Sequence, residues 1–386
     1  MKNALVLRMS LGLLAAACGN PSGGGSEVSI GKAIRLAESA AEPSVDPVVQ
    51  WNRVLLQIVR TPGAQPATIH ATRSFAILHA AIYDAVNAID RSHAPYLVRV
   101  NDAPRSASQQ VAAAVAAHDV LVALYPAMSA DLDAQLRQSL AEVPDGAGKK
   151  QGTRIGADVA AQLLALRADD GSADPPVTYV FGTAAGAYQS TPPNFAPQPQ
   201  FTSWSHVRPF ALERADQFRP RPPPALTSDE YSDAFNEVKS LGTANGSTAT
   251  ADQALTGRFW NGAIQNYWNE IAQTASVAEG LTTARNARLF ALLNLAIADS
   301  VIAMYDAKYT YNFWRPVTAI RAADTDGNPK TDADPNWLPE VGKTAPDPSY
   351  PGAHAVISAA AAAVLTDVLG TEPAKFSATS EVLPGV

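Results

Sequence analysis

The chain has 386 residues, of which 47% are hydrophobic, and its formal net charge is −7. This length and composition allow a sizeable buried core. No basic block occurs, which argues against a nucleic-acid partner, because binding to phosphates needs clustered Lys and Arg. After residue 20, no uninterrupted apolar run reaches the roughly 20 residues that a membrane-spanning helix needs.

The N-terminus has the pattern of an export signal. Two cations precede an apolar stretch that ends in Ala-Ala-Ala-Cys18, so residues 1–18 predict a secretory signal peptide. Cys18 resembles the acylated cysteine of a bacterial lipoprotein, and the alternative is ordinary cleavage after Ala17. Residues 19–46, which include three consecutive glycines, predict a flexible tether. We therefore expect an exported bacterial protein at the periplasm or cell surface, with membrane contact only through a lipid anchor.

Residues 47–171 predict an N-terminal helical region. Apolar residues recur at helical spacing over residues 47–92, with a break at Thr61-Pro62-Gly63. Further helical patterns cover residues 106–125, 129–142 and 149–169.

A proline-rich connection follows in residues 172–227. It contains eleven prolines and shows little apolar periodicity. Such a stretch is too long to be a simple loop. We expect it to wrap the surface or to line a site.

Residues 228–386 predict a C-terminal helical region. Helical patterns cover residues 228–242, 252–273, 281–308 and about 354–369. Residues 322–348 are rich in Asp, Pro and Gly and predict a loop. Because strand-type alternation is scarce throughout, the predicted fold class is mainly α, with one helical bundle or two.

The stretch KYTYNFWRP, residues 308–316, combines two cations with several aromatic side chains. Seven residues make about two helical turns, so Lys308 and Arg315 are expected on nearly the same helix face. Pro316 disfavours helical geometry at Arg315, which predicts that the helix ends there. Arginine forms forked hydrogen bonds to phosphate-like oxygens, and lysine adds a point charge. The alternative is a helix C-terminus that carries favourable cations and packs through its aromatic residues.

The stretch YPGAHA opens the last predicted helix. Backbone N–H groups at a helix start are free and carry the positive end of the helix dipole, so Gly352 and Ala353 offer a place for an anion. His354 lies in the same turn, and histidine transfers protons near neutral pH. Helix capping is the alternative role for His354. Together with Lys308 and Arg315, this turn predicts an oxyanion site.

Both stretches resemble motifs of one superfamily. KYTYNFWRP is similar to the K-x6-R-P motif of the type-2 phosphatidic acid phosphatase superfamily, and YPGAHA is similar to its P-S-G-H motif. The surrounding sequence most resembles the bacterial vanadium-dependent haloperoxidase branch. The resemblance implies an α-helical fold in which Lys308, Arg315 and backbone amides at Gly352 and Ala353 bind vanadate or phosphate. It also implies that His354 acts as an acid and base.

The chain departs from the superfamily pattern in two ways. Gly352 and Ala353 stand where the motif has serine and glycine, so a hydroxyl donor is lost while a backbone N–H remains. The third motif, S-R-x5-H-x3-D, is absent, because no arginine or histidine follows His354. We therefore expect the chain to be truncated just before that motif.

An earlier segment has a similar spacing. Arg73 and His79 are separated as R-x5-H, but Asp84 follows His79 by five residues where the motif needs four. The segment also precedes the other motifs. We expect these three residues to belong to an ordinary amphipathic helix.

Three functions remain open at this point. The first is an exported haloperoxidase that binds vanadate and oxidises halide with peroxide. The second is an acid phosphatase-type phosphomonoester hydrolase that uses the same oxyanion cradle without vanadate. The third is a non-catalytic phosphate-binding lipoprotein, which Gly352, Ala353 and the missing third motif favour. No separate metal site is predicted, because the acidic loop at residues 324–335 fails the EF-hand template.

Overall fold

The computed structural model describes residues 45–66, 69–370, 376, 378–383 and 385. One compact unit spans Val45–Val386, and its regular structure is helical apart from isolated β-bridges. The predicted mainly α fold is confirmed. The predicted signal peptide, Cys18 and nearly all of the predicted tether lie outside the described residues.

Eleven α-helices lie in the described part of the chain. In chain order they are α1 (Pro47–Arg60), α2 (Ala71–Asp90), α3 (Gln109–Leu124), α4 (Ser129–Ala141), α5 (Ala147–Arg167), α6 (Asp229–Leu241), α7 (Ala251–Phe259), α8 (Ile264–Ala278), α9 (Thr283–Tyr311), α10 (Pro316–Arg321) and α11 (Ala353–Leu369). Side-chain oxygens of Ser108, Ser228, Thr250 and Thr282 cap the N-termini of α3, α6, α7 and α9. Such caps satisfy a free backbone N–H and mark where each helix begins.

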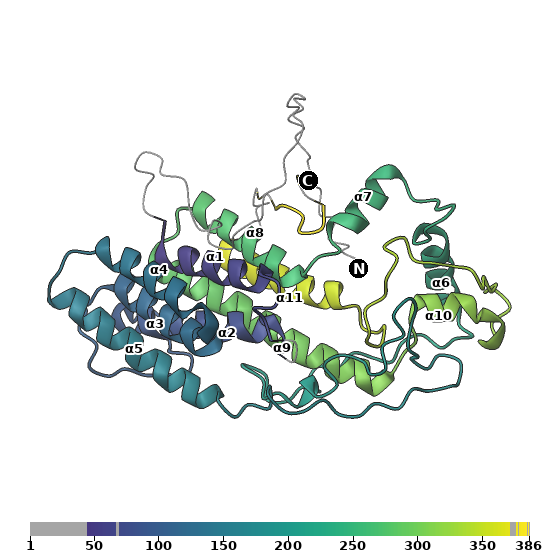
Figure 1. Cartoon of the computed structure of the whole chain (residues 1–386), viewed down its shortest axis with the longest axis horizontal. Coiled ribbons are helices and arrows are strands. Elements are labelled where there is room, and N and C mark those ends of the chain that lie inside the picture. The colour runs from purple at the N-terminus through teal and green to yellow at the C-terminus, as the bar shows by residue number, and fades with distance from the viewer. Residues whose placement is uncertain (1–44, 67–68, 371–375, 377, 384, 386) are drawn as a thin grey trace, which may run out of the picture. The chain divides into compact units, whose positions relative to one another are not determined.

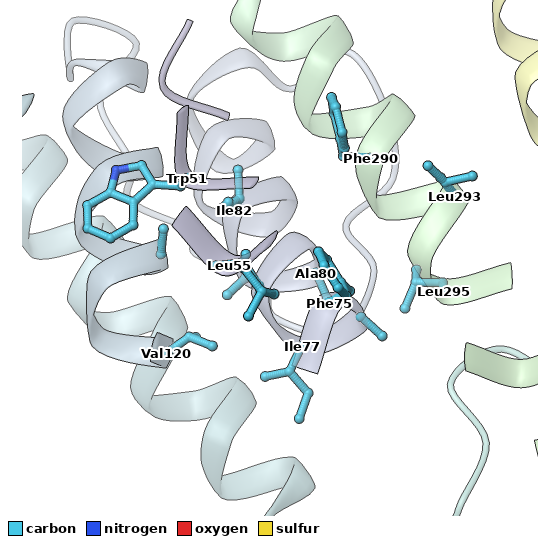
Figure 2. Packing of buried hydrophobic residues seen from close by; sticks show 14 of the residues in the cluster. Trp51, Leu55, Phe75, Ile77, Ala80, Ile82, Val120, Phe290, Leu293 and Leu295 are labelled. Carbon is cyan, nitrogen blue, oxygen red and sulfur yellow. The ribbon is translucent and has the colours of Figure 1, made fainter. Parts of the chain in front are cut away.

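Helix α9 lies at the centre of the hydrophobic core. It packs against α2 and α11 and also contacts α1 and α8, as Figure 1 shows. Figure 2 shows buried side chains from α1, α2, α3 and α9, among them Trp51, Leu55, Phe75, Ile77, Ala80, Ile82, Val120, Phe290, Leu293 and Leu295. The two predicted helical regions therefore contribute to one shared core.

By length and composition alone, α9 is long and apolar enough to cross a membrane. However, 72% of its most apolar window is buried inside the protein. A helix that is apolar on most sides is typical of the centre of a large core. Packing within the protein therefore accounts for the apolar surface of α9.

The proline-rich connection lies against the C-terminal end of α9. Its backbone hydrogen bonds run from Tyr188 N to Asn312 O at 2.7 Å and from Trp314 N to Gly186 O at 2.9 Å. The connection was expected either to wrap the surface or to line a site. These bonds place it beside the segment that carries Lys308 and Arg315.

The helix predicted at residues 252–273 is in fact two helices, α7 and α8, separated by residues 260–263. A Cβ atom added at Gly262 would lie 2.6 Å from the Tyr267 hydroxyl oxygen, which leaves no room for a side chain. The Asn261-Gly262 pair is a turn signal, and it outweighs the apolar periodicity on either side.

Candidate oxyanion site

Lys308 and Arg315 do not lie on one helix, so the expected shared helix face is wrong. Helix α9 ends at Tyr311, and Asn312 follows in the left-handed conformation with φ of 49°. Arg315 is the N-cap of α10, whose first residue is Pro316. Proline suits a first helical position, because the N–H that it lacks has no partner within the helix there. The turn between α9 and α10 therefore brings the two cations together.

The Lys308 ammonium is buried against the loop that precedes α11. Its side chain is 1% exposed. Nζ donates to the backbone oxygen of Pro348 and, at 3.4 Å, to that of Ser349. Nζ also lies 3.4 Å from Oδ1 of Asp347. These three acceptors match the three donors of an ammonium group.

Asp347 links Lys308 to Arg315. Nη2 of Arg315 donates to the same Oδ1 of Asp347, and Nε donates to the Asp347 backbone oxygen at 2.6 Å. The side chains of Arg315 and Asp347 are only 17% and 11% exposed. A single carboxylate oxygen therefore marks the point at which the two cations converge.

Burial controls the ionisation of both cations. Burial, reinforced by the Arg315 guanidinium, lowers the pKa of Lys308 to about 6. Burial also lowers the pKa of Arg315 from its usual value, although nearby tyrosines oppose this. The loss of hydration penalises the charged form of each group. A negative charge brought beside them would therefore favour the charged form of each group.

Backbone hydrogen bonds fix the loop on both sides of Asp347. Gln200 N donates to Pro346 O at 2.8 Å, and Ser349 N donates to Phe313 O at 2.9 Å. The first bond comes from the proline-rich connection and the second from the turn after α9. The position of Asp347 is therefore set by the fold as well as by its ion pairs.

Three tyrosines border Arg315. Tyr305 and Tyr309 stack on α9 with ring centroids 6.2 Å apart, and Tyr188 comes from the proline-rich connection. All three interact electrostatically with the guanidinium and oppose the lowering of the pKa of Arg315 by burial. The Tyr309 hydroxyl donates to the backbone oxygen of Gln200. The other two hydroxyls have no hydrogen-bond partner in the described part of the chain.

Gly352, Ala353 and His354 form the start of α11, where the sequence predicts a helix to begin. Gly352 is the N-cap, and no side chain caps this end. His354 is exposed, and no hydrogen bond joins it to another described residue. Of the predicted site residues, the structure therefore joins Lys308 and Arg315 through Asp347, and it makes no such link to the helix start.

The earlier R-x5-H segment has separate structural roles. Nε of Arg73 donates to Asp170 at 2.8 Å. Nε2 of His79 lies 2.8 Å from the Asn52 amide oxygen. The Asp84 carboxylate accepts three backbone N–H groups of a neighbouring loop. The three side chains share no partner, which agrees with their expected place on an ordinary helix.

The two acidic residues of α9 near Lys308 hold the proline-rich connection. Asp306 forms a two-pronged pair with Arg219, at 2.6 and 2.8 Å. Asp299 accepts the backbone N–H groups of residues 210–212. Both carboxylates are thus used in packing the connection onto α9.

Known proteins share this fold and the region of the site. Residues 288–385 match the family described as the VCPO second helical-bundle domain. The chain is 25% identical over 394 residues to the vanadium chloroperoxidase of Curvularia inaequalis. That alignment covers 81% of this chain and 64% of the relative, so the chain spans just under two thirds of its length.

Solved structures of vanadium-dependent haloperoxidases also resemble this chain. The first bacterial vanadium-dependent iodoperoxidase structure superposes with a TM-score of 0.69 at 25% identity, over 86% of this chain and 83% of the other. The chain is a relative of the vanadium haloperoxidases. The holo-type bacterial vanadium-dependent chloroperoxidase shares the fold, with a TM-score of 0.58 at 16% identity over 90% of this chain and 83% of the other.

Asp347 is the site residue of this haloperoxidase relative that sequence reasoning missed. It lies between two prolines in PDPSYP, at the end of a predicted loop that holds several other acidic residues. Its place just before the YPGAHA stretch is the one signal that separates it from them. Contact with both cations becomes evident only once the loop is folded onto the turn after α9.

Proposed function

We propose that this chain binds vanadate at Lys308 and Arg315 and oxidises halide with peroxide. The observation that carries the proposal is the convergence of both cations on one oxygen of Asp347. A buried lysine and a buried arginine around one point suit a compact oxyanion, whose negative charge would favour the protonated form of Lys308. The names of the relatives, a vanadium chloroperoxidase and a vanadium-dependent iodoperoxidase, support vanadate and halide as the ligands.

The donor groups fit vanadate as an oxyanion. Lys308 would contribute a point charge, Arg315 its guanidinium charge and the donors of Nη1, and the amides of Gly352 and Ala353 the positive end of α11. A Cβ atom added at Gly352 meets no atom within 4 Å, so the backbone there is open to approach. When bound, vanadate would supply a Lewis-acid centre that activates peroxide. No histidine follows His354 in the sequence, so a side chain that ligates vanadium is left unassigned.

His354 is assigned to proton transfer. It is exposed on the first turn of α11, beside the free amides of the helix start, and histidine is the side chain suited to general acid and base catalysis. Replacement of His354 by Ala is expected to lower turnover by about 100-fold or more, the usual contribution of a general acid or base. Vanadate affinity is expected to stay unchanged, because His354 is not one of the converging cations.

Phosphomonoester hydrolysis is the second candidate function. The same convergence of Lys308 and Arg315 suits the oxygens of a substrate phosphate, since vanadate and phosphate are both tetrahedral oxyanions. In that case His354 would protonate the leaving oxygen. Binding of phosphate without turnover of any ester would instead support the third candidate, a phosphate-binding protein.

The purified chain, loaded with orthovanadate, is to be assayed for peroxide-dependent bromination or iodination of a dye. Hydrolysis of p-nitrophenyl phosphate is assayed in parallel without vanadate. Halide oxidation that requires vanadate is the expected result. Replacement of Lys308 or Arg315 by Ala is expected to abolish it, whereas Lys330→Ala, at an exposed ion pair with Asp229, leaves it unchanged. Ester hydrolysis without halide oxidation would overturn the proposal in favour of the phosphatase.

We also propose that the protein is exported, because its first 18 residues have the pattern of a lipoprotein signal. Expression in a bacterium, followed by fractionation and mass measurement of the N-terminal peptide, tests this. An acylated Cys18 in the membrane fraction is expected, and Cys18→Ser is expected to remove the acyl group. Recovery of the uncleaved chain from the cytoplasm would contradict export.

A further inference from the structure

We propose that Asp347 makes this site selective for oxyanions that carry a proton. The inference rests on the proposed oxyanion site and specifies which anions enter it. Its starting point is that a carboxylate lies between Lys308 and Arg315, where a simple anion site would hold only donors.

Asp347 is a built-in part of the site. The residue is only 8% exposed. Its backbone N–H donates to Ala345 O at 2.9 Å, and its backbone oxygen accepts from Nε of Arg315 at 2.6 Å. Withdrawal of the side chain would break its contacts with both Lys308 and Arg315 and remove the negative partner that they share among the described residues. An incoming anion therefore binds beside Asp347 and does not replace it.

The groups that remain free define what this anion meets. Within the described ranges, Nη1 of Arg315 and the hydroxyls of Tyr188 and Tyr305 have no hydrogen-bond partner. These are donors, and they suit the bare oxygens of an anion. Oδ2 of Asp347 also has no partner there, and as an ionised oxygen it only accepts. The free groups are thus several donors and one acceptor.

This set distinguishes two classes of oxyanion. Phosphate, arsenate and vanadate retain a hydroxyl near neutral pH, and that hydroxyl can donate to Oδ2 of Asp347. Sulfate and selenate carry no proton under these conditions, so one of their oxygens would face the carboxylate with like charge. A hydrogen bond to a charged group corresponds to about tenfold or more in affinity. Protonated oxyanions are therefore favoured.

The wild-type chain gives the first test. Isothermal titration near neutral pH with phosphate, arsenate, sulfate and selenate is expected to show about tenfold or greater preference for the first two. Equal affinity for phosphate and sulfate would overturn the selectivity while leaving the oxyanion site in place. Failure of all four anions and of orthovanadate to bind would contradict the proposed function itself.

The variant Asp347→Asn isolates the carboxylate. Because the amide is neutral and can also donate, sulfate affinity is expected to rise by about tenfold or more, and the phosphate-to-sulfate ratio to fall to within about threefold. An equal gain for both anions would overturn the proposal, since it would show that Asp347 merely competes for the cations. Asp324→Asn, an exposed aspartate in the same chain region, is the matched control and keeps the wild-type ratio. If Asp347→Asn does not fold, the wild-type anion series still decides.

Discussion

Two buried aspartates in this protein each pair with two cations, but the two clusters differ in their surroundings. One oxygen of Asp170 lies 2.8 Å from Nε of Arg73 and 2.8 Å from Nη2 of Arg167. One oxygen of Asp347 likewise faces the two cations of the candidate site. The charges are the same in number and sign. The groups around each cluster therefore decide what it does.

Protein groups use most of the donors in the Asp170 cluster, although Nε of Arg167 is buried without a hydrogen-bond partner among the described residues. Arg73 also donates to a backbone oxygen at 2.8 Å, and Arg167 donates to two more while its guanidinium lies 3.8 Å from the centre of the Phe210 ring. Burial opposes the ionisation of Asp170, yet hydrogen bonds from Arg73 and Ser172 lower its pKa below the usual value. This cluster joins α2 to the end of α5 and has a structural role.

The Asp347 cluster retains unused hydrogen-bonding groups and a weakly held proton. Its lysine has a pKa lowered to about 6, whereas both cations of the other cluster are arginines. Because Nε of Arg167 is also without a partner in the described part of the chain, one free donor does not make a ligand site, and we propose that the Asp347 cluster is one because it offers several donors. Neighbouring tyrosine hydroxyls and Arg315 supply those donors here.

The largest expected difference between the two clusters is the loss of stability when each carboxylate is removed. Asp170→Asn is expected to lower the free energy of unfolding by about 3–5 kcal/mol, because two buried arginines lose their shared counter-charge. Asp347→Asn is expected to cost only about 1–2 kcal/mol, because Lys308 can lose its proton and Arg315 keeps a backbone acceptor. Chemical denaturation measures both values. Equal losses would remove the distinction between the clusters.

The variant Lys308→Arg gives the candidate site two arginines, as in the Asp170 cluster, and tests whether the lysine makes the difference. In wild type, anion affinity is expected to fall as pH rises above about 6, because Lys308 then loses its charge, by at most about tenfold per pH unit. Lys308→Arg keeps its charge and should flatten that profile. Titration of both proteins with orthovanadate in the same buffers cancels the ionisation of the anion itself. Parallel profiles would show that Lys308 does not titrate in this range.

The two clusters should also change the stability of the protein over different pH ranges. The pKa of Lys308 in the folded protein is about 6, below its ordinary 10.5, so between these values the unfolded chain binds the extra proton. Stability from Lys308 therefore rises with pH over that range, and Lys308→Arg should reduce the slope. The lowered pKa of Asp170 gives stability that is lost as pH falls below its ordinary 3.8, and Asp170→Asn should reduce that slope. Denaturation midpoints at several pH values measure both slopes, and unchanged slopes would contradict the assignments.

Gly352→Ser should have the smallest effect. No atom lies within 4 Å of an added Cβ, and α11 lacks a side-chain cap. A serine N-cap differs from glycine by only a few tenths of a kcal/mol, so stability is expected to rise by about that amount. The added hydroxyl should strengthen vanadate binding by about tenfold at most, the value of one hydrogen bond. A clear loss of stability would show that the helix start is more crowded than the structure indicates.

Local signals account for what was predictable. Apolar periodicity placed most of the helices, and the spacing of Lys308 and Arg315 identified the candidate cations. The route by which they meet was not predictable. Left-handed Asn312 ends α9 before Arg315, and Pro316 begins a new helix where it was expected only to end one.

Asp347 was missed for a different reason. Its contacts join segments more than thirty residues apart, as the separation of 32 residues from Arg315 shows. Periodicity and capping are local signals and carry no information on such pairings. The partners of Arg73 and Asp84 were likewise set by tertiary packing, which is why their spacing alone resembled a motif.

The central claim is that Lys308 and Arg315 together hold one oxyanion. Isothermal titration of orthovanadate into wild type and the Lys308→Ala/Arg315→Ala double variant, with Lys330→Ala as a control, tests it most directly. Wild type and control are expected to bind one vanadate per chain, and the double variant is expected to lose about 100-fold or more in affinity, since hydrogen bonds to charged groups contribute roughly 1.5–3 kcal/mol each. Undiminished binding by a folded double variant would contradict the account.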